Sequence, residues 1–94
     1  MRDYIEVKQI PFGDKTLRSK NELSLVVLKD DNMLHCEDYS LRIDCYAYTM
    51  EELKRYIEED IKISWKNYVL FDPNELTFEA LYIRNTLLRI FEEI

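Results

Sequence analysis

Glycine is almost absent from this chain, since Gly13 is the only one among 94 residues. Glycine adopts positive φ without steric cost, so tight hairpin turns and phosphate-cradling loops normally depend on it. A β-sandwich or barrel, which needs many sharp turns, is therefore disfavoured. The motifs GxxxxGK(S/T), GxGxxG, GxSxG and HExxH do not occur, which argues against nucleotide-binding loops, serine hydrolases and zinc proteases.

Histidine and cysteine are also scarce: the chain has one histidine, His35, and two cysteines, Cys36 and Cys45. Two cysteines are too few for a disulfide scaffold, so we expect reduced thiols in a cytoplasmic protein. His35 and Cys36 are neighbours on a predicted strand and point to opposite faces, which prevents a Cys–His dyad. One histidine and two cysteines nine residues apart also lack the short ligand spacing of a zinc site.

Carboxylates are plentiful but are not spaced as a catalytic pair. Asp30 and Asp31 fall at a predicted turn, where aspartate is favoured for local hydrogen bonding. Glu58, Glu59 and Asp60 follow each other on a predicted helix, where successive side chains diverge by about 100°. We therefore predict no catalytic residue, no cofactor and no metal ligand, and a protein that is not an enzyme.

Long apolar runs are missing as well. No stretch approaches the roughly 18 residues that a membrane span requires, and the first residues carry charges in place of an apolar leader. We expect no membrane association. Residues 1–94 have the length of a single domain with one hydrophobic core.

Acidic residues outnumber basic ones by 19 to 13, which gives a net charge of −6. Nucleic-acid affinity depends on lysine and arginine neutralising phosphates, so we expect no direct nucleic-acid binding. The excess is concentrated in residues 30–60, where ten acids accompany three bases for a net of −7. We therefore expect an exposed acidic surface.

Alternating apolar residues in the first half predict three or four antiparallel strands. The clearest covers residues 40–48, where one face is apolar throughout: Leu41, Ile43, Cys45 and Ala47. An apolar run at 25–28 predicts a strand over 23–29 that is buried on both faces. Residues 14–21 are polar and basic, and we predict a loop there. The other predicted elements are strands at 4–10 and 33–37, and turns at 11–14 and 30–32.

From Thr49 onward the apolar period changes to three and four residues, which predicts helices. Thr49 and Glu52 form a capping box, in which each satisfies a backbone N–H of the first turn. The first helical stripe contains Met50, Leu53, Ile57, Ile61, Trp65 and Tyr68, and the second contains Leu76, Ala80, Ile83, Leu87, Ile90 and Ile94.

These patterns together predict an α+β fold, with a small antiparallel three- to four-stranded sheet followed by two helices packed on one face. Three apolar stripes then have to meet in one core. We expect the following side chains to be buried there: Leu41, Ile43, Cys45, Ile57, Ile61, Ile83 and Leu87.

Both helices carry apolar residues outside their stripes, Tyr56 and Ile63 on the first and Leu81 and Leu88 on the second. A two-helix layer buries wide stripes, which would account for them. Alternatively, one flank is a subunit or partner interface. Together with tyrosines on the less buried sheet face, they predict a homodimer that associates through Leu81, Leu88, Tyr46 and Tyr48.

The acids of the first helix support a different prediction, a protein partner with a basic surface. Complementary charge accelerates encounter and rejects wrong partners. The residues predicted to contact that partner are Glu51, Glu52, Tyr56, Glu58, Glu59 and Asp60.

A short pattern joins these elements in residues 33 to 90. A hairpin and a strand lead into Thr49-Met50-Glu51-Glu52-Leu53, an aromatic-tipped helix follows through Trp65 and Tyr68, and Glu75-Leu76-Thr77 with Ala80 begins the last helix. This order resembles the HicB-like antitoxins, in which a sheet feeds a helix through a G-x-T-x-E-E-A junction. Here Ala47 and Leu53 replace the family's glycine and alanine. The resemblance implies a protein that binds a small toxin ribonuclease and holds it inactive, often as a dimer.

Two functions are left open by these residues. The first is a protein-binding regulator that captures a basic partner, of which the antitoxin is the sharpest version. The second is a self-associating structural or accessory protein whose acidic residues keep it in solution.

Overall fold

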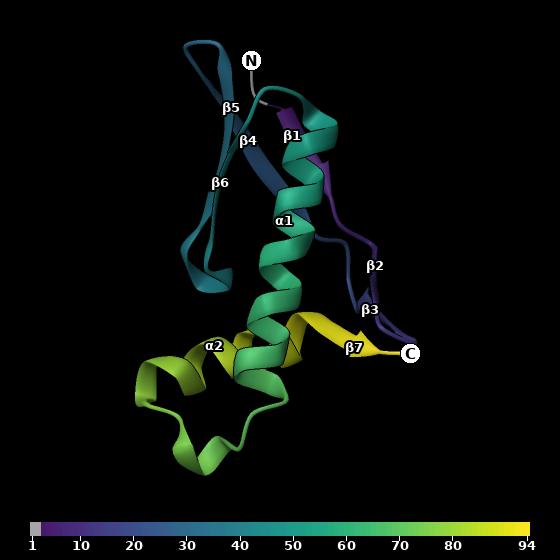
Figure 1. Ribbon diagram of the computed structural model, residues 1–94, viewed down its shortest axis with the longest axis vertical. Helices are drawn as coiled ribbons and strands as arrows, with labels where there is room; N and C mark the ends of the chain where they lie inside the picture. The colour runs from purple at the N-terminus through teal and green to yellow at the C-terminus, as the bar shows by residue number, and fades with distance from the viewer. Residues whose placement is uncertain (1–2) are drawn as a thin grey trace.

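The computed structural model describes residues 3–94 and combines two antiparallel sheets with two α-helices (Figure 1). One sheet has the order β1-β4-β5-β6, formed by β1 (Asp3–Glu6), β4 (Ser24–Asp30), β5 (Met33–Asp38) and β6 (Ile43–Ala47). The other has the order β2-β3-β7, formed by β2 (Gln9–Phe12), β3 (Lys15–Ser19) and β7 (Phe91–Glu93). The helices are α1 (Met50–Ser64) and α2 (Phe78–Ile90). The predicted α+β class is confirmed.

Helix α1 covers the inner face of the four-stranded sheet and contacts β5, β6 and β2 (Figure 1). Successive strand residues point to opposite faces, so a sheet with one covered face should alternate buried and exposed residues. β6 follows this rule from Ile43 to Ala47, with Asp44 and Tyr46 exposed between buried neighbours. The predicted alternation of this strand is therefore confirmed. Its predicted start at residue 40 is not, because Tyr39–Leu41 forms the 3-10 helix η1.

The two tight hairpin turns use the same backbone geometry with different residues. Gly13 has φ 62° between β2 and β3, and Asp31 has φ 55° between β4 and β5. Aspartate tolerates this left-handed conformation better than most residues because its short side chain can hydrogen-bond locally. One glycine is therefore sufficient for the two hairpins.

Residues 3–12 pair with residues 15–27 in two different registers. Gln9 pairs with Arg18, whereas Glu6 pairs with Ser24. Two residues lie between Glu6 and Gln9, whereas five lie between Arg18 and Ser24. The three extra residues, at positions 20–22, bulge outward. The predicted continuous strand at 4–10 was wrong for this reason. The predicted loop at 14–21 was also wrong, since Lys15–Ser19 is β3.

β4 alternates where the sequence predicted burial on both faces. Leu25 and Val27 are buried in the core, whereas Val26 and Leu28 are exposed to 37% and 50%. That prediction failed because a short apolar run does not reveal whether a second layer covers the sheet. Nothing in residues 3–94 covers the outer side of β4.

Each helix begins at a threonine cap. The Thr49 hydroxyl oxygen accepts from the Glu52 N–H at 3.1 Å, and Thr77 accepts from the Ala80 N–H at 3.2 Å. The predicted N-cap at Thr49 is confirmed, but the Glu52 carboxylate accepts from the Thr49 hydroxyl at 3.1 Å and not from a backbone N–H as predicted. Between the helices, α1 continues as the π-helical turn η2 (Trp65–Val69), and the 3-10 helix η3 (Pro73–Glu75) precedes α2.

Helix α2 packs against η1, η2 and β7 at one end of the molecule (Figure 1). Its predicted stripe extended to Ile94, but the helix ends at Ile90 and the next residues form β7. β7 pairs with β3, and the Thr16 and Ile94 backbones exchange hydrogen bonds of 2.8 and 3.0 Å. This pairing with a distant segment replaces the last helical turn.

The buried apolar residues form one cluster that joins both sheets and both helices. All seven side chains predicted to form the core are buried: Leu41, Ile43, Cys45, Ile57, Ile61, Ile83 and Leu87. The core also includes residues from segments predicted as turns or loops, such as Leu17 at 0% exposure.

Candidate functional site

The acids predicted on the first helix lie on different sides of α1. Glu52, Tyr56 and Glu59 are spaced by four and three residues and therefore share one flank. Glu51 is on another side, where it lines a groove beside β1. Asp60 faces β6 and accepts a hydrogen bond from the Cys45 thiol at 3.0 Å. The six predicted partner-binding residues, of which Glu58 is the sixth, therefore do not form one surface.

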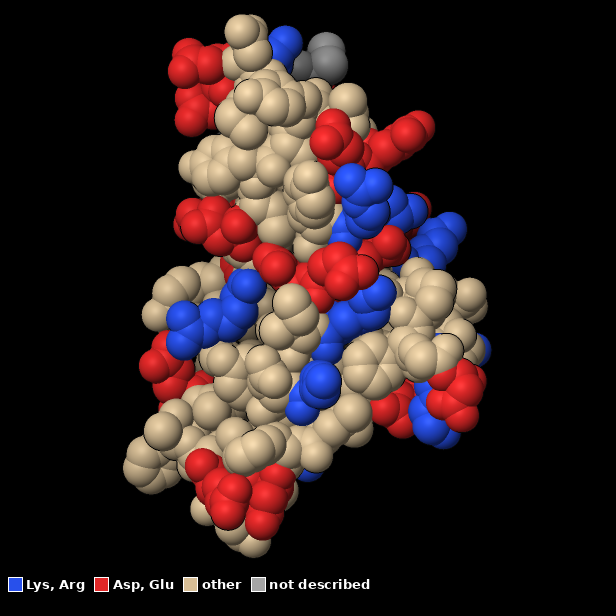
Figure 2. Space-filling view, viewed as in Figure 1, with Lys and Arg blue, Asp and Glu red and all other residues tan. Residues whose placement is uncertain are grey.

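Basic side chains lie among these acids. Glu59 forms an ion pair with Lys62 at 2.8 Å, and the Arg55 guanidinium lies 5.5 Å from the centre of the Tyr56 ring. Figure 2 shows red and blue atoms alternating across the middle of this face. Consecutive helix positions are rotated by about 100°, so acids close in sequence are distributed around the helix. The surface of α1 is consequently mixed in charge.

The residues predicted to support self-association occupy two elements. Tyr46 is on β6 and Tyr48 directly follows that strand, and both are exposed, to 47% and 69%. Leu81 is half-buried on α2, and Leu88 is exposed to 36%. The tyrosines therefore belong to the sheet and the leucines to the other end of the fold.

The outer face of the four-stranded sheet, opposite α1, carries a continuous surface of apolar and acidic side chains. We call it the outer sheet face and define it by the outward strand positions: Tyr4, Glu6, Ser24, Val26, Leu28, Asp30, Met33, His35, Glu37, Asp44 and Tyr46. Cross-strand neighbours on it include Tyr4 with Val26, and His35 with both Leu28 and Tyr46. Apolar side chains therefore form its centre.

The charges on the outer sheet face all have one sign. Its ionised side chains are the acids Glu6, Asp30, Glu37 and Asp44, and none of its positions within residues 3–94 holds lysine or arginine. The ionised side chains at the outward strand positions are therefore all acidic, although Glu6 also pairs with Lys8 at 3.8 Å. This distinguishes the outer sheet face from the mixed surface of α1.

His35 lies within this face and is held on two sides. Its ring stacks on Tyr46, with the centroids 4.0 Å apart and the planes 4° from parallel. Its Nε2 is 2.9 Å from Asp44 Oδ1 and 3.9 Å from Glu37 Oε2. The side chain is only 15% exposed. One imidazole nitrogen and two carboxylates therefore converge at a defined point of the sheet.

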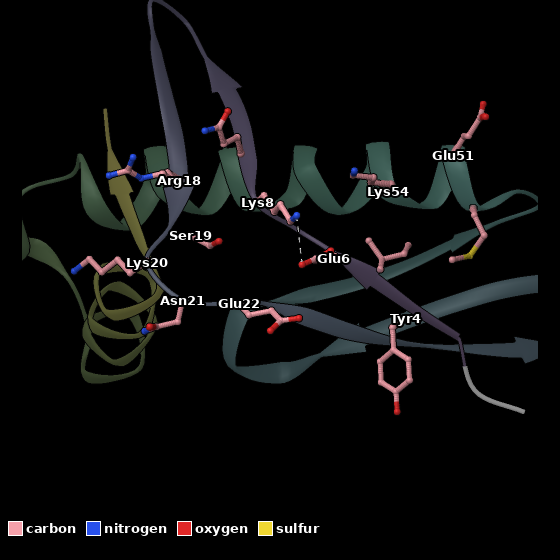
Figure 3. A pocket seen from close by; sticks show the side chains of 13 residues that line it. Tyr4, Glu6, Lys8, Arg18, Ser19, Lys20, Asn21, Glu22, Glu51 and Lys54 are labelled. Atoms are coloured by element: carbon pink, nitrogen blue, oxygen red, sulfur yellow. Dashed lines mark ion pairs between the residues drawn. The ribbon is translucent and has the colours of Figure 1, made fainter.

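A separate open groove of about 1160 Å³ lies between α1 and β1 (Figure 3). Glu51 and Lys54 of α1 border it on one side, and Glu6 of β1 borders it on the other. The three bulged residues at 20–22 also line it. Tyr4 also lines the groove, on the same face of β1 as Glu6, and its ring points away from α1.

Three of the four basic side chains that line the groove are engaged by neighbours. Lys8 pairs with Glu6 at 3.8 Å, and Arg18 pairs with Glu92 at 2.8 Å. Lys20 donates to the Leu88 carbonyl at 2.7 Å. The groove therefore presents a balanced lining and no cluster of catalytic groups, and we place the candidate site on the outer sheet face.

The two cysteines are free, and neither belongs to this face. Cys36 and Cys45 are opposite each other on the inner side of β5 and β6. Burial raises the pKa of the Cys36 thiol to about 11, with a contribution from the charge of Asp38. Burial, together with the hydrogen bond and charge of Asp60, raises the pKa of Cys45 to about 12. Raised values keep both sulfurs protonated and unreactive near neutral pH.

Comparison with protein-family models, with curated proteins and with solved structures found no match to this chain. Neither α1 nor α2, the α-helices of residues 3–94, has the length and apolar character needed to cross a bilayer. Function therefore has to be argued from the surface itself.

Sequence reasoning did not identify the cluster of His35, Glu37 and Asp44. His35 and Glu37 are two apart and so share a strand face, which the sequence does reveal. The position of Asp44 depends on the register between β5 and β6, in which Glu37 pairs with Asp44. A hairpin with its turn near residue 40 would place Glu37 and Asp44 opposite each other, and this was the signal that the sequence offered.

Proposed function

We propose that this chain is a non-catalytic protein-binding domain that docks a basic partner protein on its outer sheet face. The supporting observation is the surface composition of this face, with exposed apolar side chains at its centre and only acids among its ionised side chains. Antiparallel sheets with one solvated face usually place polar residues there. Exposed contiguous apolar surface is typical of interaction sites.

The charge pattern favours a foreign partner over a second copy at this face. Two copies meeting through the outer sheet face would bring together surfaces that carry acids and no lysine or arginine. A basic partner would supply the missing charge and accelerate encounter. An antitoxin-like inhibitor of a small basic nuclease is one protein of this kind, as the resemblance of residues 33–90 implies.

The alternative proposal is a self-associating accessory protein, for which the α2 flank with Leu81 and Leu88 is the candidate interface. Partner capture and self-association are compatible, because they use different elements. In either case the buried cysteines with raised thiol pKa values suit a reducing compartment such as the cytosol.

The test compares capture of partner proteins from the native host by matched variants. Val26→Lys with Tyr46→Lys changes the outer sheet face, whereas Phe78→Lys with Tyr82→Lys makes the same charge change on exposed residues of α2. We expect the first pair to weaken capture at least about tenfold, because truncating a central interface anchor typically costs about 2 kcal/mol or more. The α2 pair should leave capture unchanged.

A third variant addresses the acids of α1. Glu58→Lys with Glu59→Lys tests the helix surface, and a loss of capture there alone would move the interface to α1. Association with the partner should also slow as salt is added, since exposed charges are screened beyond roughly 8 Å at physiological ionic strength. Unchanged affinity of the sheet-face variant for every partner would refute the proposal.

A further inference from the structure

We propose that His35, Glu37 and Asp44 form a binding site for a divalent transition-metal ion such as Zn²⁺. Each of the three side chains offers one donor atom, and these atoms all lie within 4.8 Å of one another. Nε2 of His35 is 2.9 Å from Asp44 Oδ1 and 3.9 Å from Glu37 Oε2. Metal–ligand bonds of about 2.0–2.2 Å to nitrogen and oxygen would require only small side-chain adjustments from this arrangement.

The backbone holds the three donors in place. His35 and Glu37 are two residues apart on β5 and therefore point to the same face. Asp44 is directly opposite Glu37 on β6, within a register of five consecutive residue pairs. A site built on paired strands is better ordered than one on a loop.

The histidine ring itself is constrained before any ion binds. Tyr46 stacks on it in parallel, and the His35 side chain is only 15% exposed to solvent. Nε2 is the nitrogen that faces both carboxylates. This fixes the ring orientation that a ligand needs and lowers the entropy cost of binding.

The negative charges of Glu37 and Asp44 also favour a bound cation. Like charges directly opposite each other on a sheet are destabilising, and Glu37 and Asp44 form such a pair. No lysine or arginine occupies an outward position of these four strands in residues 3–94. A divalent ion bound between Glu37 and Asp44 would neutralise both carboxylates.

The donor set selects the class of ion. Ca²⁺ and Mg²⁺ prefer oxygen ligands throughout. One imidazole nitrogen with two carboxylates suits a borderline ion such as Zn²⁺, and the two carboxylates also suit Mn²⁺. Three protein ligands leave at least one coordination position for water or another donor.

Binding requires an unprotonated Nε2. The proton that Nε2 shares with Asp44 in the hydrogen bond must move to Nδ1 or leave to solvent as the metal bond forms. Metal binding at this nitrogen therefore displaces the hydrogen bond to Asp44.

The experiment titrates the purified protein with Zn²⁺ by calorimetry, beside three variants. The wild-type protein should bind one equivalent. His35→Gln and Asp44→Asn should each lower the affinity at least about tenfold, because even losing a group that only supports a ligand costs roughly 10–100-fold. Glu58→Gln removes one negative charge from α1 and should leave the affinity unchanged.

Paramagnetic broadening by Mn²⁺ gives a readout that does not depend on the variants folding. Broadening of amide signals confined to the β5–β6 hairpin around residues 35–37 and 44 supports the site. Equal Zn²⁺ affinity of His35→Gln, competition by equimolar Ca²⁺, or broadening spread over all acidic segments would refute it. Each of these outcomes would leave His35 as an ordinary hydrogen-bond partner of Asp44.

Discussion

Cys36 and Cys45 lie directly opposite each other on β5 and β6, and both side chains are buried against α1. The Cys45 thiol donates to Asp60 Oδ2 at 3.0 Å, which links the sheet to the helix. Ionising either sulfur would place a negative charge in the core, and for Cys45 also beside a carboxylate. The two thiols should therefore make the fold sensitive to alkaline pH.

We expect the free energy of unfolding to fall as pH rises above about 9. In the unfolded chain the thiols ionise near 9.0, whereas in the folded protein they ionise near 11 and 12. Between these values the unfolded state has lost protons that the folded state retains, so raising the pH favours unfolding. Urea denaturation at pH 7 and at pH 10.5 measures this difference.

Other groups also titrate at alkaline pH, so the matched control is Cys36→Ala with Cys45→Ala. This double variant should be less stable at neutral pH but should lose less stability between the two pH values. An identical pH dependence of both proteins would contradict the assignment to the thiols.

Replacing Leu87 by alanine should lower the free energy of unfolding by roughly 2–5 kcal/mol. Leu87 is 0% exposed and belongs to the buried core, so its removal leaves a cavity there. Phe78→Ala is the matched control, because Phe78 is 94% exposed and a surface change typically stays within about 0.5 kcal/mol. Equal losses in the two variants, measured by chemical denaturation, would show that α2 is not oriented as described.

Thr49→Ala should cost about 0.5–2 kcal/mol of stability, the usual effect of losing a helix N-cap. The Glu52 N–H would lose its acceptor, which lies at 3.1 Å in the native protein. Thr49→Ser retains the hydroxyl and should restore most of the loss. A serine variant as unstable as the alanine variant would assign the effect to the lost methyl group instead of the cap.

Self-association should depend on α2 and not on the outer sheet face. We expect sedimentation equilibrium at micromolar concentration to report a dimer, and Leu88→Lys to convert it to a monomer. Tyr46→Lys should leave the dimer intact, because a surface that carries only acids does not complement itself. A wild-type monomer at high concentration would remove the dimer and leave the exposed apolar surface to other proteins.

The parts of the fold that sequence predicted correctly depend on local periodicity. Leu41, Ile43 and Cys45 alternate with polar residues, and Thr49 with Glu52 forms a recognisable cap, so the last strand of the sheet and the start of α1 were both located. These signals arise within a few residues. They do not require knowledge of which distant segment packs on them.

Two of the failures involve pairing between distant residues. Leu17 is the one apolar residue in β3, and it becomes buried because β3 lies between β2 and β7. Phe91 leaves the helical stripe because it pairs with Ser19. Neither pairing can be inferred from the local sequence. Residues 14–21 therefore resembled a loop, and residues 91–94 resembled the end of a helix.

The candidate site was missed for a related reason. Glu37 and Asp44 are seven residues apart in sequence and meet only because the β5–β6 register places them opposite each other. The acids of α1, although denser in sequence, are dispersed around the helix and interleaved with Arg55 and Lys62. Sequence density of charge therefore pointed to the helix, whereas strand pairing concentrated uncompensated charge on the sheet.

The pairing of β7 with β3 has a consequence during synthesis. Ser19 and its partner Phe91 are 72 positions apart, and a ribosome adding about 5–20 residues per second needs roughly 4–14 s to reach Phe91. The β2–β3 hairpin can close within microseconds of its emergence. For several seconds the nascent chain therefore exposes the unpaired edge of β3 and the side chain of Leu17, which is the interval in which a chaperone would bind it.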